Sequence, residues 1–167
     1  MTLLDAPKFD EARERRKRTI LVSVLSLLVV CFVGFWLASG RPVDWPWHWN
    51  SHLMGRMRAN QFLHAVENNE MEKAYGIWEH DPKWQQHPNK YPYPYHRFIG
   101  DWGPGMIENT YGTIHSHKIV AARLHGNVLL MAILVNDRKS NALNMTYDPQ
   151  DGTLDFAPED VYIYLGK

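Results

Sequence analysis

Residues 19–40 read TILVSVLSLLVVCFVGFWLASG and contain neither a charged residue nor a proline. An α-helix rises about 1.5 Å per residue, so a helix of this length reaches about 33 Å and covers a hydrocarbon layer of about 30 Å. A helix buried in a soluble core would carry polar residues along one side, and only Ser23, Ser26 and Ser39 interrupt this run. The segment therefore predicts one transmembrane helix.

Basic residues are concentrated on the N-terminal side of this segment. Residues 1–18 contain six Lys or Arg against four Asp or Glu, whereas residues 41–167 contain twelve against fourteen. The basic residues next to the span are Arg15, Arg16, Lys17 and Arg18. By the positive-inside rule, the basic tail 1–18 stays in the cytoplasm and the C-terminal part lies across the membrane. We expect a single-pass protein of the inner (plasma) membrane, with a periplasmic or extracellular domain.

A cleaved signal peptide is the main alternative to a retained anchor. The apolar region of a signal peptide is usually about 7–15 residues long, and the run here is longer. Ala38, Ser39 and Gly40 nevertheless resemble the small residues of a cleavage site. We expect the helix to remain as an anchor.

Aromatic residues gather where the predicted helix leaves the membrane. They are Trp36, Trp45, Trp47 and Trp49. Tryptophan prefers the boundary between lipid and water, where its ring is apolar and its N–H finds a hydrogen-bond partner. These four residues and the four basic ones before the span are therefore predicted to contact the bilayer interface, which makes the lipid bilayer the first predicted partner.

The composition leaves room for one domain. The chain has 167 residues, so about 120 remain after the apolar segment, which is close to the commonest domain size. The formal net charge of +0 argues against a nucleic-acid partner, which would favour a basic surface. The single cysteine, Cys31, lies inside the apolar run, so no intramolecular disulfide can form.

The domain is expected to occupy residues 51–167 and to begin with a helix. Residues 41–50, RPVDWPWHWN, are predicted to form a juxtamembrane linker, because their prolines and tryptophans do not make a stable helix. Asn50 or Ser51 is expected to cap the first helix, which ends at residues 68–69. Its apolar residues at helical spacing are Leu53, Met54, Met57, Phe62, Leu63 and Val66.

Residues 81–95, which we call the Pro-Tyr segment, separate two further predicted helices. Its four prolines alternate with the aromatic residues Trp84, Tyr91, Tyr93 and Tyr95. Such a segment forms neither a regular helix nor a central strand. A helix over about 70–80 is expected before it, and a short helix over 95–102 after it.

The periodicity then changes to that of strands. Residues 111–124 and 142–147 alternate in polarity, and residues 128–135 form a continuous apolar run. Shorter strands are expected at 154–156 and 161–165. Turn signals separate these runs at 126–127, 136–137 and 151–152. Helices followed by an antiparallel meander predict an α+β fold, with the helices laid across one concave face of a curved sheet.

The stretch FLHAVENNEMEKAYGIW (62–78) resembles the helical opening of bacterial membrane-anchored proteins with NTF2-like domains, the cones of the SnoaL and ketosteroid-isomerase type. The matching residues are Phe62, Leu63, Ala65, Asn68, Glu72, Lys73, Ala74, Tyr75 and Trp78. The segments DWG (101–103), YGTI (111–114), KIVAA (118–122) and residues 136–158 resemble an uncharacterised bacterial family of that kind. The resemblance implies a cone over about residues 55–158, from which the insertion YPYPY (91–95) departs. It implies no particular activity, because such folds host enzymes, binders and scaffolds.

The histidines raise the question of a metal site. His115 and His117 would lie on one side of a strand, and His48 and His52 one helical turn apart. A zinc site needs three or four converging ligands, and neither pair has a third nearby in the sequence, although Asp101 or His125 could approach in space. Surface or partly buried histidines explain both pairs more simply. We expect no metal and no cofactor.

Catalytic residues are suggested only by the family resemblance. Isomerases with this cone use a carboxylate base and a tyrosine or protonated acid as oxyanion donor. The corresponding candidates are Asp101 as base with Tyr75 or Tyr111 as donor, and His115 as an alternative base. The simpler interpretation makes both tyrosines core residues and Asp101 the end of a helix. We expect a non-enzymatic protein, with an isomerase-like or hydrolase-like enzyme as an alternative.

The Pro-Tyr segment is the best candidate for a binding surface, because protein interfaces are enriched in tyrosine and tryptophan. The predicted binding residues are Trp84, Tyr91, Tyr93, Tyr95 and Trp102. The same rings could instead cover the open end of a small core. The sequence thus predicts an anchored binding or scaffold module that contacts a partner protein or a small apolar ligand. An accessory subunit of a larger membrane complex is the other non-enzymatic alternative.

Overall fold

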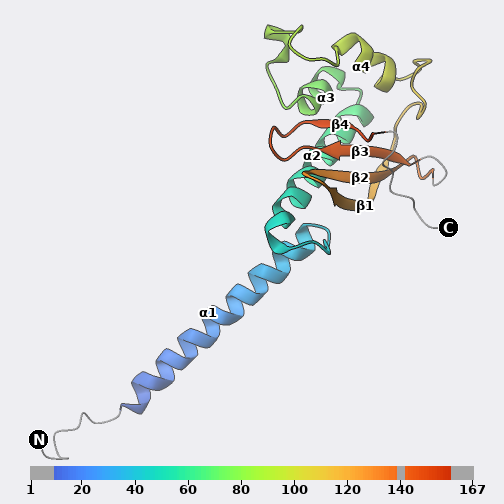
Figure 1. Ribbon diagram of the computed structural model, residues 1–167. Coiled ribbons are helices and arrows are strands. Elements are labelled where there is room, and N and C mark those ends of the chain that lie inside the picture. Colours follow the sequence, from blue (N-terminus) through green and yellow to red (C-terminus); the bar gives the residue numbers. More distant parts are fainter. Residues whose placement is uncertain (1–9, 139–141, 159–167) are drawn as a thin grey trace, which may run out of the picture. The chain divides into compact units, whose positions relative to one another are not determined.

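The computed structural model describes residues 10–138 and 142–158 and divides the chain into two compact units, Met1–Ala38 and Ser39–Lys167 (Figure 1). The first unit contains one long helix, α1 (Glu11–Ala38). By length and composition α1 can cross a membrane, and its apolar side chains are exposed. A signal sequence near an N-terminus has the same properties.

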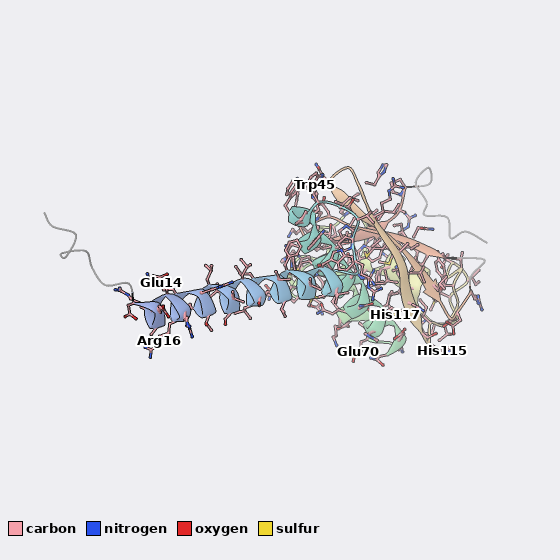
Figure 2. All side chains as sticks on the ribbon, turned by 90° about the horizontal axis from the view of Figure 1, so that it is seen from below. Glu14, Arg16, Trp45, Glu70, His115 and His117 are labelled. Atoms are coloured by element: carbon pink, nitrogen blue, oxygen red, sulfur yellow. The ribbon has the colours of Figure 1, made fainter. Side chains whose placement is uncertain are left out.

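Helix α1 begins eight residues before the predicted span, so the described part of the basic tail is helical. Asp10 accepts a hydrogen bond from the backbone N–H of Arg13 (3.1 Å), which satisfies one of the free donors at the helix start. Lys17 pairs with Glu14 at 2.8 Å, one turn apart. Glu14 and Arg16 lie on the first turns of α1 (Figure 2). These local contacts extend the helix beyond its apolar part.

The second unit is an α+β domain, as the sequence predicts. Its helical part comprises η2 (Pro46–His48), α2 (Trp49–Glu67), α3 (Met71–Trp78), η3 (Trp84–Gln86) and α4 (Tyr95–Trp102). Its sheet comprises β1 (His117–His125), β2 (Val128–Val135), β3 (Leu143–Tyr147) and β4 (Leu154–Phe156). The strands follow the order β1-β2-β3-β4 with antiparallel neighbours, and form a curved, open sheet (Figure 1). Helix α2 contacts β1 and β2, and α3 contacts β4.

Most predicted boundaries agree with the structure. Helix α4 and strand β2 have the predicted bounds, and α2 ends at Glu67 with Asn68 as its C-cap, followed by Asn69 in the left-handed conformation (φ 58°). Strand β1 starts later than predicted, at His117. The preceding loop is organised by the buried Asn109, whose amide donates to the carbonyls of Gly103 and Gly112 (3.0 Å each). The predicted strand at 161–165 lies outside the described residues.

The start of α2 and part of its buried face differ from the prediction, whereas Phe62, Leu63 and Val66 are buried as predicted. The helix begins at Trp49 and has no side-chain N-cap, so neither Asn50 nor Ser51 caps it. Met54 and Met57 are 43% and 47% exposed, because the helix turns its small residues toward the sheet instead.

Gly55 explains this choice of face. A Cβ at Gly55 would lie 2.7 Å from Leu129 Cδ2 and 2.8 Å from the Tyr147 ring. At Gly55 the helix therefore approaches β2 and β3 closely, because it carries no side chain there. Hydrophobic periodicity assigns the face to the larger methionines and misses this requirement.

Aromatic rings fill the space between the helices and the sheet. Phe62 packs edge-on against Trp102 with ring centroids 4.8 Å apart, and lies 5.1 Å from Trp78. Phe98 joins the same cluster, and all four side chains are at most 2% exposed. The sheet contributes an apolar layer in which Met131 and Ile133 are fully buried. The interior of the domain is therefore a packed core.

The β3–β4 turn depends on Gly152. This residue has φ +78°, and a Cβ there would collide with the ring of His80, which hydrogen-bonds the carbonyl of Asp151. Gly152→Ala should lower the free energy of unfolding by about 2–3 kcal/mol, because it adds a collision to the backbone strain. Gly126→Ala in the β1–β2 turn is the matched control, since Gly126 has φ +60° and an added Cβ meets nothing within 4 Å.

Denaturant unfolding of the two variants separates the cost of the collision with His80 from the cost of the left-handed backbone. The control should lose about 1 kcal/mol from the left-handed backbone alone. Equal losses in the two variants would mean that the contact between His80 and the turn contributes nothing.

Candidate functional site

A groove runs between the Pro-Tyr segment and the β3–β4 turn. Its volume is about 780 Å³. We call it the tyrosine groove; its lining residues are Trp78, Glu79, His80, Asp81, His87, Lys90, Tyr91, Pro92, Tyr93, Asp151, Thr153, Leu154 and Asp155. Two tyrosines and four carboxylates thus border one concave surface, which is assembled from segments about 60–70 residues apart in the chain.

Asp81 fastens the Pro-Tyr segment at one end of the groove. Its carboxylate accepts hydrogen bonds from the Tyr91 hydroxyl and from the Lys83 backbone N–H (2.8 Å). His87 Nε2 lies 2.6 Å from the same carboxylate. These bonds, that from Tyr91 foremost, hold the pKa of Asp81 well below its usual range. Asp81 is therefore ionised at physiological pH, and its hydrogen bonds join the start of the Pro-Tyr segment to later residues of the same segment.

Tyr93 ties the Pro-Tyr segment to α3 and α4 by hydrogen bonds. Its hydroxyl donates to Asp101 Oδ2 at 2.7 Å, and its backbone carbonyl accepts a bond of 2.6 Å from the Tyr75 hydroxyl. Burial, followed by the carboxylate of Asp101, raises the pKa of Tyr93, and burial raises that of Tyr75 to about 12. Both phenols remain protonated donors at physiological pH. The conformation of the Pro-Tyr segment is therefore fixed by hydrogen bonds of Tyr91 and Tyr93.

Glu79 is a carboxyl group in the groove whose pKa lies near physiological pH. Burial, and next the negative charges of Asp155 and Asp151, raise its pKa to about 7, while Lys90 opposes the shift. Near neutral pH, Glu79 is thus divided between its charged and neutral forms. A carboxyl group of this kind in a concave surface is a common feature of functional sites.

Replacing Glu79 by glutamine tests this electrostatic arrangement. A pKa raised from 4.5 to about 7 in the folded state stabilises the protein below pH 4.5, and this contribution is lost as the pH rises through 7. The free energy of unfolding of the E79Q variant should not fall in this way, because glutamine does not ionise. At pH 8 it should exceed that of wild type by roughly 1–2 kcal/mol, a figure reduced for solvent screening. Denaturant unfolding of both proteins between pH 4.5 and 8 measures this difference. The same pH dependence of the free energy of unfolding in both proteins would contradict it.

Of the five predicted binding residues, two line the groove. Tyr91 and Tyr93 border it, whereas Tyr95 packs at 4.6 Å from Trp84 in the core-facing layer. Trp84 and Trp102 are 6% and 2% exposed and do not line this groove, so a binding role for them stays a prediction. Trp84 packs on Tyr75 and donates its indole N–H to the Glu72 carbonyl (3.1 Å).

The suggested catalytic residues do not converge. Tyr75 is fully buried with its hydroxyl engaged by Tyr93, and Asp101 accepts the hydroxyl of that same tyrosine. The hollow beside Asp101, about 340 Å³, is lined by neither Tyr75 nor His115. His115 is exposed, and Tyr111 stacks on Trp102.

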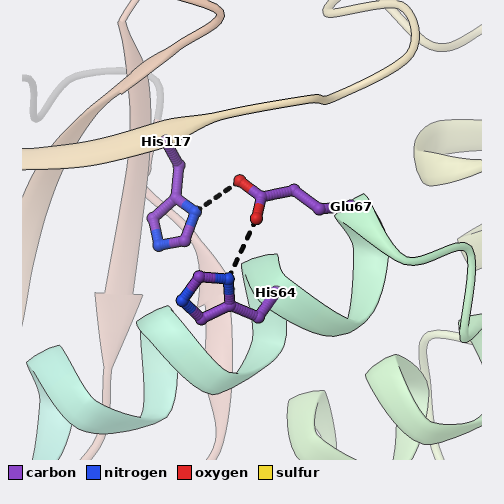
Figure 3. Close-up of side chains that lie close together, drawn as sticks. All are labelled: His64, Glu67 and His117. Carbon is purple, nitrogen blue, oxygen red and sulfur yellow. Dashed lines mark hydrogen bonds and ion pairs between the residues drawn. The ribbon is translucent and has the colours of Figure 1, made fainter.

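The histidine pairs of the sequence are divided by the fold. His52 is buried, and its Nε2 lies 2.7 Å from a carboxylate oxygen of Asp44. His117 joins His64 and Glu67 on α2, a group that does not include His115 (Figure 3). The spacing of His64 and Glu67, three residues apart on a helix, was the overlooked signal, because it places both side chains on one face.

The predicted interfacial tryptophans also differ from one another. Trp45 and Trp47 are each 68% exposed and stack with parallel rings 5.0 Å apart. Trp49 is 6% exposed and donates its indole N–H to the Asp44 carbonyl (2.8 Å), so it belongs to the domain. Trp36 lies near the end of α1.

A second cavity, of about 870 Å³, is lined by residues of α3 and by residues on either side of it in the chain. Met71, Ile77 and Trp84 give it an apolar floor, and charged residues such as Arg58 and Glu70 surround it. Comparison with known proteins adds no assignment to either cavity, since no family model, no curated protein and no solved structure matches this chain.

Proposed function

We propose that this chain is a membrane-anchored, non-enzymatic binding module, and that the tyrosine groove holds a positively charged segment of a partner protein. The supporting observation is the combination of Glu79, Asp151 and Asp155 with two fixed tyrosine rings in one groove. Carboxylates attract ammonium and guanidinium groups, and tyrosine faces attract them too. Lys90 already lies over the Tyr91 ring, 5.0 Å from its centroid.

Binding of a cation would change the protonation of the groove. A positive charge near Glu79 favours its ionised form and lowers its pKa from about 7. The groove would therefore bind a basic segment more tightly as the pH rises from 6 to 8.

The membrane anchor would support this function by confining the domain to the membrane surface. A retained helix α1 keeps the domain near the bilayer and raises its effective concentration for other membrane proteins. Arg15, Arg16, Lys17 and Arg18 would hold the N-terminus in the cytoplasm, with the domain on the periplasmic or extracellular side of the inner membrane. Trp45 and Trp47 would lie at the lipid boundary.

The experiment is purification of the tagged full chain from native membranes in mild detergent, followed by size-exclusion chromatography and mass spectrometry. The expected result is a defined partner that is recovered with wild type and lost with Asp155→Lys, which reverses a charge in the groove. Glu108→Lys is the control, since Glu108 is an exposed carboxylate outside the groove. Equal recovery with both variants would exclude the groove. The intact mass, 19.5 kDa for the full chain, distinguishes an anchor from a cleaved signal.

A small apolar ligand is the second candidate, and the apolar floor of the cavity beside Met71, Ile77 and Trp84 favours it. A partner retained in fixed ratio through every purification step would instead indicate an accessory subunit of a membrane complex. Membership of the NTF2-like superfamily is part of the same proposal, supported by the order of helices and sheet.

A further inference from the structure

Three potential metal ligands meet where the end of α2 faces the start of β1 (Figure 3). Glu67 Oε1 lies 2.6 Å from His117 Nδ1, and Glu67 Oε2 lies 3.0 Å from His64 Nδ1. One donor atom from each residue lies within 4.8 Å of the other two. The group joins residues 50 positions apart, so it is a product of the tertiary fold.

We propose that His64, Glu67 and His117 bind a divalent transition-metal ion of the Zn²⁺ type. Two imidazole nitrogens and one carboxylate oxygen are a donor set that Zn²⁺ accepts, with bonds of about 2.0–2.1 Å to nitrogen. Such a tetrahedral ion holds its donors about 3.3 Å apart. The two hydrogen bonds already bring the carboxylate to comparable distances from both rings, and the exposed His64 can adjust.

The surroundings of His117 fit a metal ligand. Its second ring nitrogen, Nε2, lies 3.0 Å from Asn60 Oδ1. With metal bound, a proton on Nε2 would donate to that acceptor, and Nδ1, the atom that faces Glu67, would give up its proton and coordinate the ion. Metal-binding histidines commonly donate their other N–H to such an oxygen, which fixes the ring and its tautomer.

Burial divides the site into a fixed and an open side. The side chains of His117 and Glu67 are 5% and 13% exposed, whereas that of His64 is 67% exposed. Two ligands are thus held by the protein, and the ion can enter from solvent on the side of His64. Three protein ligands leave a fourth position of the tetrahedron for water or for an external group. Bound metal would also join α2 to β1.

The test uses the full chain in detergent, purified through a tag without histidine and titrated with Co²⁺ and Zn²⁺. We expect one ion per chain, visible d–d absorption from bound Co²⁺, and its loss when Zn²⁺ displaces it. His64→Ala should weaken binding by at least about 100-fold, and Asn60→Ala by about 10-fold, as for an outer hydrogen-bond partner. His115→Ala is the matched control, an exposed histidine two residues from His117, and should bind as wild type does.

Thermal unfolding gives an independent reading. Zn²⁺ at 100 times its dissociation constant should raise the Tm of wild type by roughly 10 °C, and should not raise that of Glu67→Gln. Melting in EDTA checks that Glu67→Gln is folded, and His64→Ala, which changes an exposed side chain, provides a second folded variant. Equal binding by His64→Ala and His115→Ala, or no Zn²⁺-dependent change in wild type, would overturn the proposal.

Discussion

Replacing Phe62 by alanine is expected to lower the free energy of unfolding of the domain by about 3–5 kcal/mol. Phe62 is fully buried, and its ring contacts those of Trp78, Phe98 and Trp102. Truncation removes the apolar area of one ring, leaves a cavity among rigid neighbours and breaks three aromatic contacts. Many domains of this size have a total stability of 5–15 kcal/mol, so the variant should be marginally folded at 37 °C.

Met57→Ala is the control for this variant, because Met57 lies on the same helix but is 47% exposed. Its free energy of unfolding should change by at most about 0.5 kcal/mol. Urea unfolding followed by tryptophan fluorescence measures both variants. A loss of less than 1 kcal/mol for Phe62→Ala would mean that the aromatic cluster can collapse around the missing ring.

The parts of the fold that depend on neighbouring residues were predictable. The apolar run 128–135 with turn residues on both sides predicted β2, and the short helix expected over 95–102 is α4. Left-handed residues at Asn69 and Gly126 occur where the sequence signalled a helix end and a turn. Each of these signals lies within a few residues of the element it predicts.

The parts that failed depend on residues far apart in the sequence. The buried face of α2 follows from the close approach of Gly55 to Leu129 and Tyr147, about 70–90 positions later. The burial of Trp102 follows from its stacking on Phe156, with parallel rings 5.5 Å apart. Composition can identify an aromatic residue as a binding candidate, but only tertiary packing decides whether its ring faces solvent.

The same distinction applies to the candidate sites. Tyr91 and Tyr93 were predictable because both lie in one unusual segment, whereas the raised pKa of Glu79 depends on Asp151 and Asp155, which only the fold brings near it. The pairing of His117 with Glu67 likewise joins two elements that nothing in the local sequence connects. Electrostatic and metal-binding properties of this kind arise from convergence in space.

The second large effect concerns helix α1. Leu25 and Val29 lie one turn apart near the middle of the predicted span and are 62% and 57% exposed. Replacing both by arginine should disfavour membrane insertion by about 5–7 kcal/mol, since one arginine at the centre of a span costs about 2.5–3.5 kcal/mol. The wild-type chain should remain in the pellet after carbonate washing of membranes, and most of the double variant should move to the supernatant.

The double replacement by alanine separates charge from helix length and packing, and should remain in the pellet because alanine preserves an apolar helix. If the arginine variant also sediments, then the domain itself holds the chain at the membrane, and the exposed stacked pair Trp45 and Trp47 becomes the attachment to mutate next. If it is released with its full mass, the apolar run is the anchor. The uncharged run 19–40 would then be the part of the chain that keeps the proposed groove and the proposed metal site near a membrane.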